Sequence, residues 1–423
     1  MIYTRIENKQ GLTMEAAKAA FMEGLAKLGK RERVLLIPPD ITRIHGLGGM
    51  LAVWATEFYG SAVKQILPAL GTHVPMTPKE IEVMYPGVDP SLFTVHDWRN
   101  DIVTIGTVPK EFIEEVSEGK LSYEWKAQVN KALVHGGFDL ILSLGQVVPH
   151  EVIGMANYNK NVFVGTGGAD GINKSHYLGA VYGMERIMGR TDSPVRAVLD
   201  YAEKHFAQEL PLVYALTVVG RNDHGEMKPM GLFVGDDRSC YEEAAALSLE
   251  VNFTMVPEPL EKVVVYLDPE EFRTTWLGNK SIYRTRMAIA DNGELIVLAP
   301  AVAGFGEDEE IDRLIRKYGY KGTPKVLSDV EKHKDLKDNL SAAAHLIHGS
   351  SEGRFTIRYC PGKLTREEIE EVGYEWGDLQ QMLQRYPIES LKDGWNTDAQ
   401  GERFYYISNP AIGLWAHSGR FND

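Results

Sequence analysis

Residues 138–144 read FDLILSL, and residues 147–176 read VVPHEVIGMANYNKNVFVGTGGADGINKSH. The shorter segment is a continuous apolar run, which is typical of a strand buried on both faces of a parallel sheet. In open α/β sheets, ligands bind in the crevice beyond the carboxyl ends of such strands. The longer segment stands at that position and carries His150, Lys160 and His176 among glycines that let the backbone turn tightly. The sequence therefore predicts a ligand site after this strand.

Strand and helix patterns alternate on both sides of this stretch, which predicts an α/β fold with mostly parallel sheets. We expect strands at 33–37, 64–70, 93–98 and 138–144, helices at 13–29, 46–63, 77–85, 123–135, 193–208 and 241–254, and a hairpin of 212–220 with 231–236. A second series has strands at 263–268, 294–300, 355–360 and 404–408 and helices at 280–290, 309–318 and 364–385.

These two series predict two α/β domains, with the active site in the cleft between them. The N-terminal domain, residues 1–257, would carry the catalytic histidines and the point of cofactor attachment. The C-terminal domain, residues 258–423, would complete the substrate cleft, and its last residues could pack back onto the first domain.

Composition narrows the class of protein. The 423 residues are 44% hydrophobic and 25% charged, as in a soluble globular protein, and the net charge of −14 argues against a nucleic-acid partner. No run reaches the roughly 18 apolar residues that span a bilayer, and the N-terminus lacks the apolar core of a signal peptide. Cys240 and Cys360 lie too far apart for a zinc motif or a disulfide framework. We therefore expect a cytoplasmic protein with no membrane partner.

Polar residues follow several of the predicted strands. Asp40, Thr42 and Arg43 come after the first strand, His73 after the second and His150 after the central one. Each residue also has a plainer interpretation, because aspartate often caps helices and histidine is often a hydrogen-bonded loop residue. Their repeated occurrence at strand ends favours a site.

The glycine-rich run GTGGADG at 165–171 leaves two interpretations open. Its backbone N–H groups could hold a phosphate. It could equally be an ordinary glycine loop, because the dinucleotide-binding fingerprint, with its acidic residue about 20 positions further on, is incomplete.

Several motifs resemble one known family. They are PPDITR at 38–43, ALGTHVPMT at 69–77, VVPHEVIG at 147–154, NYNK at 157–160 and KSH at 174–176. The sequence resembles the nickel-pincer lactate racemase family, a group of 2-hydroxyacid racemases and epimerases. In that family the catalytic histidine, the cofactor-bearing lysine and the nickel-ligand histidine are separated by ten and sixteen residues, and His150, Lys160 and His176 reproduce both intervals.

This resemblance implies a nickel-pincer nucleotide, pyridinium-3-thioamide-5-thiocarboxylic acid mononucleotide with nickel, attached covalently to Lys160. His176 would be the protein ligand of the nickel, for which imidazole is well suited. His73 and His150 would be the catalytic pair, and cofactor-biosynthesis proteins would be partners. The remaining residues implied to contact the cofactor are Asp40, Thr42, Arg43 and Gly154.

The residue types suit the implied reaction. A 2-hydroxyacid inverts at C2 if a hydride leaves, the ketoacid rotates and the hydride returns to the other face. The hydroxyl proton must leave from either enantiomer, which requires two bases of near-neutral pKa, and histidine has that property. Arg43 can bind a substrate carboxylate with two hydrogen bonds.

The second domain departs from the pattern of lactate-specific members. Tyr283 is retained, but Arg284 replaces a glutamine, Met287 replaces a lysine, and an aliphatic or polar residue near 339–340 replaces a tryptophan. We expect Tyr283 and Arg284 to bind substrate, and an extra guanidinium favours an acid larger or more polar than lactate, such as a sugar acid or a dicarboxylic hydroxyacid. Alternatively, Arg284 points to solvent from a helix at 280–290. The segment 393–406 could contribute to the pocket or form a surface loop.

Two other functions stay open on the sequence. The first is an NAD-dependent 2-hydroxyacid dehydrogenase, which the incomplete fingerprint disfavours. The second is a non-catalytic binding protein for an anionic metabolite, which the joint presence of His73, His150 and Lys160 disfavours.

Overall fold

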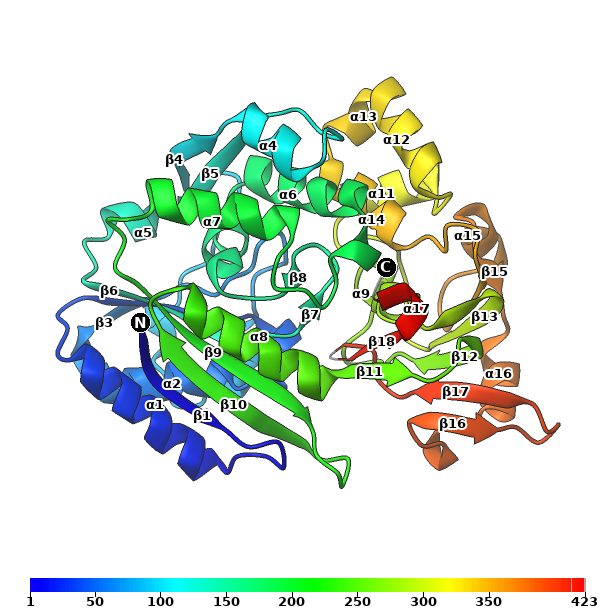
Figure 1. The fold of residues 1–423 in the computed structure, drawn as a ribbon, viewed down its shortest axis with the longest axis horizontal. Helices are drawn as coiled ribbons and strands as arrows, with labels where there is room; N and C mark the ends of the chain where they lie inside the picture. Colours follow the sequence, from blue (N-terminus) through cyan, green and yellow to red (C-terminus); the bar gives the residue numbers. More distant parts are fainter. Residues whose placement is uncertain (412, 422–423) are drawn as a thin grey trace. The chain divides into compact units, whose positions relative to one another are not determined.

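The computed structural model describes residues 1–411 and 413–421, and its contacts group the chain into two compact units (Figure 1). Unit 1 consists of Met1–Ser175 and Gly189–Asn252, and unit 2 consists of His176–Met188 and Phe253–Asp423. The sequence places a single division at 257/258. The contacts pass to unit 2 at 252/253 and also assign the short segment 176–188 to it.

Unit 1 contains a six-stranded sheet in the order β1-β10-β9-β6-β2-β3. Its strands are β1 (Ile2–Glu7), β10 (Met227–Gly235), β9 (Leu212–Arg221), β6 (Leu140–Gln146), β2 (Val34–Ile37) and β3 (Val63–Ile66). The four strands from β9 to β3 are parallel, whereas β1 and β10 are antiparallel to their neighbours. Every residue of β2 and β6 is buried, which confirms the two strands predicted from apolar runs.

The helices of unit 1 pack on both faces of this sheet. They include α1 (Met14–Leu28), α2 (Gly48–Tyr59), α3 (Pro78–Met84), α7 (Pro194–Phe206) and α8 (Arg238–Asn252). On β9, Val213 and Ala215 belong to the core formed with α1 and α2. Tyr214, between them, lies on the opposite face, where its ring is 4.4 Å from that of Tyr158. This alternation follows from the period of two along a strand.

Two expectations for unit 1 are wrong. Residues 123–135 are not one helix but β5 (Trp125–Asn130), paired antiparallel with β4 (Ile102–Val108), followed by the short α5 (Lys131–His135). In β5 the buried residues Trp125, Ala127 and Val129 alternate, so pairing with a partner strand overrides the helical spacing. Residues 93–98 form no strand, and only Phe93 bridges to Ile66.

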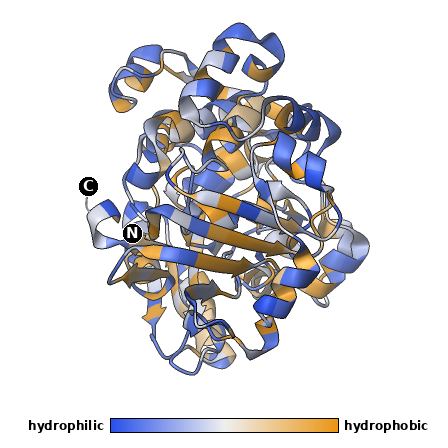
Figure 2. Ribbon diagram, turned by 90° about the vertical axis from the view of Figure 1, so that its right-hand side faces the viewer, coloured by the Kyte–Doolittle hydropathy of each residue, from blue (hydrophilic) through white to orange (hydrophobic). Residues whose placement is uncertain are grey.

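Unit 2 has a sheet of its own, in the order β15-β14-β13-β12-β17-β16. Its strands are β15 (Glu375–Trp376), β14 (Thr356–Pro361), β13 (Ile289–Ala299), β12 (Leu260–Tyr266), β17 (Arg403–Ile407) and β16 (Gly394–Thr397). All neighbours are parallel except β16 and β17, so segment 393–406 forms an antiparallel edge of this sheet. A two-stranded parallel sheet joins β11 (Phe253–Val256) to β18 (Leu414–His417). Figure 2 shows hydrophobic residues along sheet strands and hydrophilic residues on outer helices.

Two of the three helices expected in unit 2 are shorter than expected, whereas the helix expected over 309–318 is confirmed. The helices of unit 2 include α9 (Thr275–Gly278), α10 (Lys280–Tyr283), α11 (Glu309–Tyr318), α12 (Thr323–Lys332), α14 (Leu340–His348), α15 (Arg366–Glu371) and α16 (Leu379–Arg385). The helix expected over 280–290 ends at Tyr283, because β13 begins at Ile289. The helix expected over 364–385 is interrupted, because Gly373 has a φ of 97° and residues 375–376 pair with β14.

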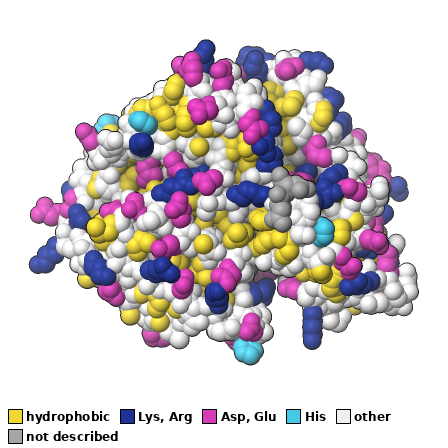
Figure 3. Space-filling model, in the orientation of Figure 1, with side chains coloured by type: hydrophobic (Ala, Val, Ile, Leu, Met, Phe, Trp, Pro, Cys, Tyr) yellow, Lys and Arg dark blue, Asp and Glu magenta, His cyan; other side chains and the backbone are white. Residues whose placement is uncertain are grey.

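Both units thus have mostly parallel sheets with helices, which confirms the α/β class. On the face drawn in Figure 3, charged side chains of both signs are interspersed. Across residues 1–411 and 413–421, no helix combines the length and apolar character needed to cross a membrane.

Candidate active site

Lys160 lies at a break in regular structure after the central strand β6. Two consecutive residues before it, Asn157 and Tyr158, have left-handed φ angles of 68° and 58°. The π-helical turn η4 (Asn161–Gly165) begins directly after it. The backbone N–H of Lys160 donates to the carbonyl of Asn157 at 3.4 Å. Single π-helical turns occur often at functional sites, and two adjacent left-handed residues are uncommon, so the backbone here is specialised.

The surroundings of Lys160 favour its neutral form. The side chain is partly buried, and this loss of hydration lowers the pKa of the amine to about 8, with the positive charge of Arg43 acting in the same direction. The negative charges of Glu151 and Asp40 act in the opposite direction. An amine with a pKa of about 8 is uncharged, and therefore nucleophilic, in roughly a tenth of the molecules at pH 7, a much larger share than for an ordinary lysine with a pKa of 10.5.

Asp40 connects the loop after β2 with His73. Its Oδ1 caps the short helix η1 (Ile41–Arg43) by accepting from Thr42, at 3.2 Å from the backbone N–H and 2.5 Å from the hydroxyl. Its Oδ2 lies 2.6 Å from Nδ1 of His73. Burial opposes ionisation of Asp40, but His73, Thr42 and Arg43 together hold its pKa below the ordinary value. Asp40 is thus both a helix cap, as the plainer interpretation has it, and the partner of His73.

The hydrogen bond to Asp40 determines which nitrogen His73 can use. An ionised carboxylate only accepts hydrogen bonds, so Nδ1 of His73 carries a proton. In the neutral ring, Nε2 then carries the lone pair that can accept a proton. The side chain is 32% exposed, so a small molecule can reach it.

His150 follows β6 in the two-residue strand β7 (Pro149–His150). Its Nδ1 accepts the backbone N–H of Val152 at 3.1 Å, which places the proton of the neutral ring on Nε2. The carboxylate of Glu151 lies 3.6 Å from the same nitrogen and is available as counter-ion when the ring is protonated. The two histidines therefore each have a carboxylate, but their neutral tautomers differ.

Backbone hydrogen bonds hold the loops of unit 1 together around Lys160. Ala69 donates to Pro38 at 2.8 Å, and Gly71 donates to Gly165 at 2.8 Å. Gly71 has a φ of 56°, which glycine adopts readily. The loop that carries His73 is thus joined both to the Asp40 loop and to the π-helical turn after Lys160.

Gly154 and His176 occupy different surroundings. Gly154 lies in β8 (Gly154–Met155) with a φ of 90°, and its carbonyl accepts from Gly189 at 3.0 Å. His176 is half-buried on α6 (Ala169–Tyr182) and is the first residue of the segment assigned to unit 2. Within the described chain, no group of three or more His, Cys, Asp or Glu side chains is arranged to hold a metal by itself.

Residues 15–187 match the family described as the lactate racemase N-terminal domain. Over these residues the chain is a homologue of the lactate racemase N-terminal domain. The matched range contains all the residues singled out in unit 1, as well as His176. This match supports a racemase or epimerase role in general.

Two solved structures resemble the homologue over nearly its whole length. A Thermotoga maritima protein, determined as a structural genomics target, superimposes with a TM-score of 0.81 and 24% identity, covering 97% of this chain and 99% of that one. The lactate racemase apoprotein from Thermoanaerobacterium thermosaccharolyticum superimposes with a TM-score of 0.67 and 18% identity, covering 92% and 88% respectively. Both likenesses show the fold. A comparison with curated proteins finds no significant match.

In the second unit of the homologue, Tyr283 and Arg284 are buried. The Tyr283 ring lies 6.2 Å from that of His348. Arg284 is 1% exposed, and its guanidinium donates to the carbonyl of Gly413 at 3.3 Å. The alternative in which Arg284 points to solvent is therefore wrong. The neighbouring Arg286 is buried and donates to Glu185 at 2.8 Å in a partly buried ion pair.

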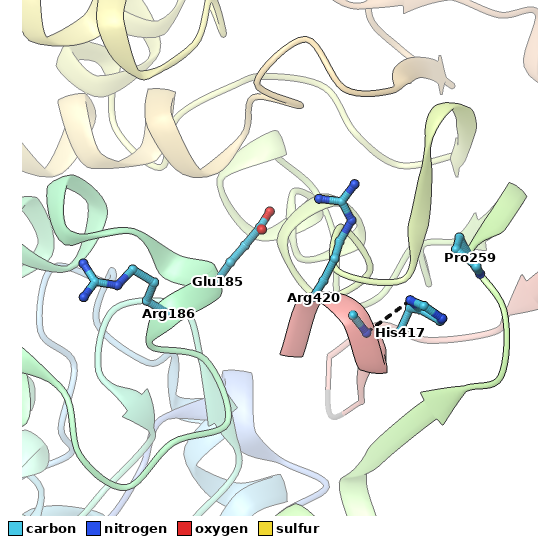
Figure 4. Close-up of a pocket in the computed structure, with 6 residues that line it drawn as sticks. Glu185, Arg186, Pro259, His417 and Arg420 are labelled. Atoms are coloured by element: carbon cyan, nitrogen blue, oxygen red, sulfur yellow. Dashed lines mark hydrogen bonds between the residues drawn. The ribbon is translucent and has the colours of Figure 1, made fainter. Parts of the chain in front are cut away.

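A separate pocket of unit 2 encloses about 540 Å³ (Figure 4). Its lining residues are Glu185, Arg186, Pro259, His417, Gly419 and Arg420. Two further arginines, Arg286 and Arg354, donate to Glu185 at 2.8 and 3.2 Å, and Arg420 donates to Asp291 at 2.6 Å. The motifs that carry the family resemblance contribute no residue to this pocket.

Sequence reasoning missed two residues near Lys160. Glu151 was visible beside His150, but a lone carboxylate carries no signal of its own. Arg196 lies 36 positions after Lys160 on α7, where an arginine ordinarily indicates a solvent-facing position, and only the structure shows that it is buried.

Proposed function

We propose that the homologue inverts C2 of a 2-hydroxyacid by hydride transfer, with a nickel-pincer nucleotide tethered to Lys160. The observation that carries this proposal is the surroundings of Lys160 in unit 1. A partly buried amine with a pKa of about 8 lies in the electrostatic field of Arg43, Asp40 and Glu151, and Asp40 in turn binds His73.

The residues fit the implied group. The Lys160 amine is suited to an amide-type linkage because its lowered pKa leaves more of it uncharged near neutral pH than in an ordinary lysine. His176 provides an imidazole for nickel, and Arg43 and Gly154 suit contacts to an anionic nucleotide. When bound, the nickel-bearing ring would supply an acceptor and donor for the hydride of C2. Cofactor-biosynthesis proteins would have to deliver it.

The two histidines would handle the hydroxyl proton. Neutral His73 can accept it at Nε2, while protonated His150 can return a proton from the other side, with Glu151 3.6 Å away as counter-ion. The opposite enantiomer uses the two rings in exchanged roles, and the protonated His73 is then stabilised by Asp40 at 2.6 Å. General acid–base groups of this kind contribute typically about 100- to 10,000-fold to a rate.

Substrate choice would involve Arg43 and Arg284. Arg43 is suited to a carboxylate, which every 2-hydroxyacid has. Arg284 is the feature that favours a substrate larger or more polar than lactate, because a buried guanidinium is stabilised by polar or anionic partners. A sugar acid or a dicarboxylic hydroxyacid meets this requirement.

Mass spectrometry tests this proposal directly. The protein is made in a host with the cofactor-building enzymes, beside a lactate racemase as loading control, and its mass and nickel content are measured. We expect an adduct on Lys160 with one nickel, and we expect His176→Ala to lose nickel while staying folded, unlike the control His135→Ala on the exposed end of α5. An unmodified Lys160 beside a loaded control would overturn the proposal, and reduction of added NAD by such protein would favour the dehydrogenase alternative.

A further inference from the structure

Arg196 is a fully buried arginine on α7 that contacts the segment leading to Lys160. Its Nη2 donates to the carbonyl of Met155 at 2.8 Å. Both Nη1 and Nη2 donate to the carbonyl of Asn157 at 3.3 Å, and Nη1 also donates to the side-chain Oδ1 of Asn159. One guanidinium thus binds three alternate residues immediately before the lysine.

The segment that Arg196 binds is unfavourable by itself. Left-handed backbone is sterically unfavourable for an L-residue, and Asn157 and Tyr158 both adopt it. Asparagine tolerates this region, but tyrosine does so poorly. The carbonyl of Asn157 accepts from both guanidinium nitrogens and from the backbone N–H of Lys160. The same oxygen therefore links the arginine to the lysine.

Further contacts fix the guanidinium in place. It lies over the ring of Tyr241 at 4.2 Å, and that ring stacks on Tyr158 at 5.3 Å with an interplanar angle of 15°. The amide of Asn159 stands between the guanidinium and two acids, because its Nδ2 donates to Asp200 at 2.7 Å and to Glu203 at 2.9 Å. Asp200 and Glu203 thus bind the Asn159 amide, and that amide binds the guanidinium of Arg196.

We infer that Arg196 is a positioning residue for Lys160, which holds the left-handed turn at 157–158 and so orients the amine for attachment of the cofactor. The inference rests on the proposed tethering at Lys160. The positive charge of Arg196 also acts with burial and Arg43 to lower the pKa of the amine. The residue therefore has two separable effects, one on geometry and one on charge.

Acetylation of unloaded protein separates these effects. The neutral amine attacks one carbonyl of acetic anhydride, and acetate and a proton leave, so the rate at Lys160 follows its uncharged fraction. Peptide mass spectrometry gives this rate across pH, with the exposed Lys126 on β5 as internal standard. For wild type we expect a midpoint near the pKa of about 8.

Three variants then test Arg196. Arg196→Met should raise the midpoint above that of wild type, although burial and Arg43 still lower it, and should lower cofactor loading at least about ten-fold. Arg196→Lys keeps the charge without the planar fork, so its midpoint should stay near 8 while loading still falls. Asn157→Gly in the Arg196→Met background eases the turn, and should restore part of the loading but leave the midpoint high.

A matched control is Arg238→Met on α8, because Arg238 also binds Asp200 but does not contact the turn. It should leave acetylation and loading as in wild type. Thermal unfolding shows which variants are folded. If Arg196→Met does not fold, the loading of Arg196→Lys tests the inference. The inference would be overturned if a folded Arg196 variant had both the acetylation midpoint and the cofactor loading of wild type. An absent adduct in wild type would refute the proposed function instead, while the acetylation profiles still decide the role of Arg196.

Discussion

The carboxylate of Asp40 lies 2.6 Å from Nδ1 of His73, in a hydrogen bond that places a ring proton on that nitrogen. The same carboxylate holds the Thr42 backbone that precedes Arg43. Asp40 therefore orients His73, which we propose as a base, and the turn that carries Arg43, which we propose to bind the substrate carboxylate. Substitution of Asp40 by asparagine, which has nearly the same size, should disturb His73 and the turn that carries Arg43 without opening a cavity.

The first prediction concerns Asp40→Asn. The amide can present N–H to Nδ1 of His73, which favours the tautomer with the proton on Nε2, so the base is lost. We expect inversion of the substrate by loaded enzyme to slow by about 100-fold or more. Asp89→Asn is the matched control, because Asp89 caps η3 (Pro90–Leu92) through Ser91 in the same way at 2.9 Å but binds no histidine. Equal rates for Asp40→Asn and the control would contradict the assignment.

The second prediction concerns the two histidines and the hydrogen at C2. His73→Gln and His150→Gln should each abolish net inversion, because one face of the substrate loses its acid or base. Wild-type enzyme should retain deuterium placed at C2, because a hydride does not exchange with water. The measurement is the deuterium content of both enantiomers by mass spectrometry. Rapid loss of deuterium to water would point to a carbanion mechanism and exclude hydride transfer.

The third prediction uses the pKa of Lys160. This pKa is about 8 in the folded chain and 10.5 for an ordinary lysine, so between these values the unfolded chain binds more protons and stability rises with pH. Lys160→Met has no amine at this position, so its stability should not show this rise with pH. In unloaded protein we expect the variant to be more stable than wild type at pH 7, by roughly 1–3 kcal/mol, and the difference to shrink as the pH rises toward 10.

Denaturant unfolding at several pH values measures this difference. Lys126→Met, at an exposed position of β5, should show no such pH-dependent gain. A constant difference between Lys160→Met and wild type from pH 7 to 10 would mean that the amine titrates normally in the folded chain.

The fourth prediction concerns substrate choice. Lactate offers only a methyl group beyond C2, so we expect it to be a poor substrate, with acids that carry polar groups at C3 preferred by about ten-fold or more. The check is kcat/KM for lactate, malate and gluconate with wild type, Arg284→Gln and the exposed control Arg366→Gln on α15. Arg284→Gln should reduce the ratio of kcat/KM for the more polar acids to kcat/KM for lactate. Lactate as best substrate, or an unchanged ranking in folded Arg284→Gln, would remove this residue from the specificity determinants.

The sequence predicts those parts of the fold that depend on local pattern. Strands β2 and β6 are continuous apolar runs, and α1 has both its apolar spacing and its Thr13 cap. The expected neighbourhood of Asp40 and His73 also follows from one rule, because parallel strands end at the same edge of a sheet.

Features that depend on distant partners were not predictable from pattern. The segment 125–130 becomes a strand only because β4 pairs with it, and α10 ends at Tyr283 because the next strand starts early. The burial of Arg196 depends on three carbonyl or amide oxygens supplied by residues 155–159, which no spacing rule connects to α7. Charged side chains satisfied by backbone leave no trace in a hydrophobicity pattern.

The assignment of residues 176–188 to unit 2 has a consequence for synthesis of the protein. Met184 and Met188 pack with Tyr283, Met287, Leu414 and Ala416, all of which leave the ribosome much later. Unit 1 can be completed once residue 252 has left the ribosome. The apolar contacts of Met184 and Met188 can be completed only after Leu414 and Ala416 have also been made. In the nascent chain, segment 176–188 therefore lacks part of its final packing until translation is nearly over. This segment is made in the first half of the chain but is among the last to reach its native contacts.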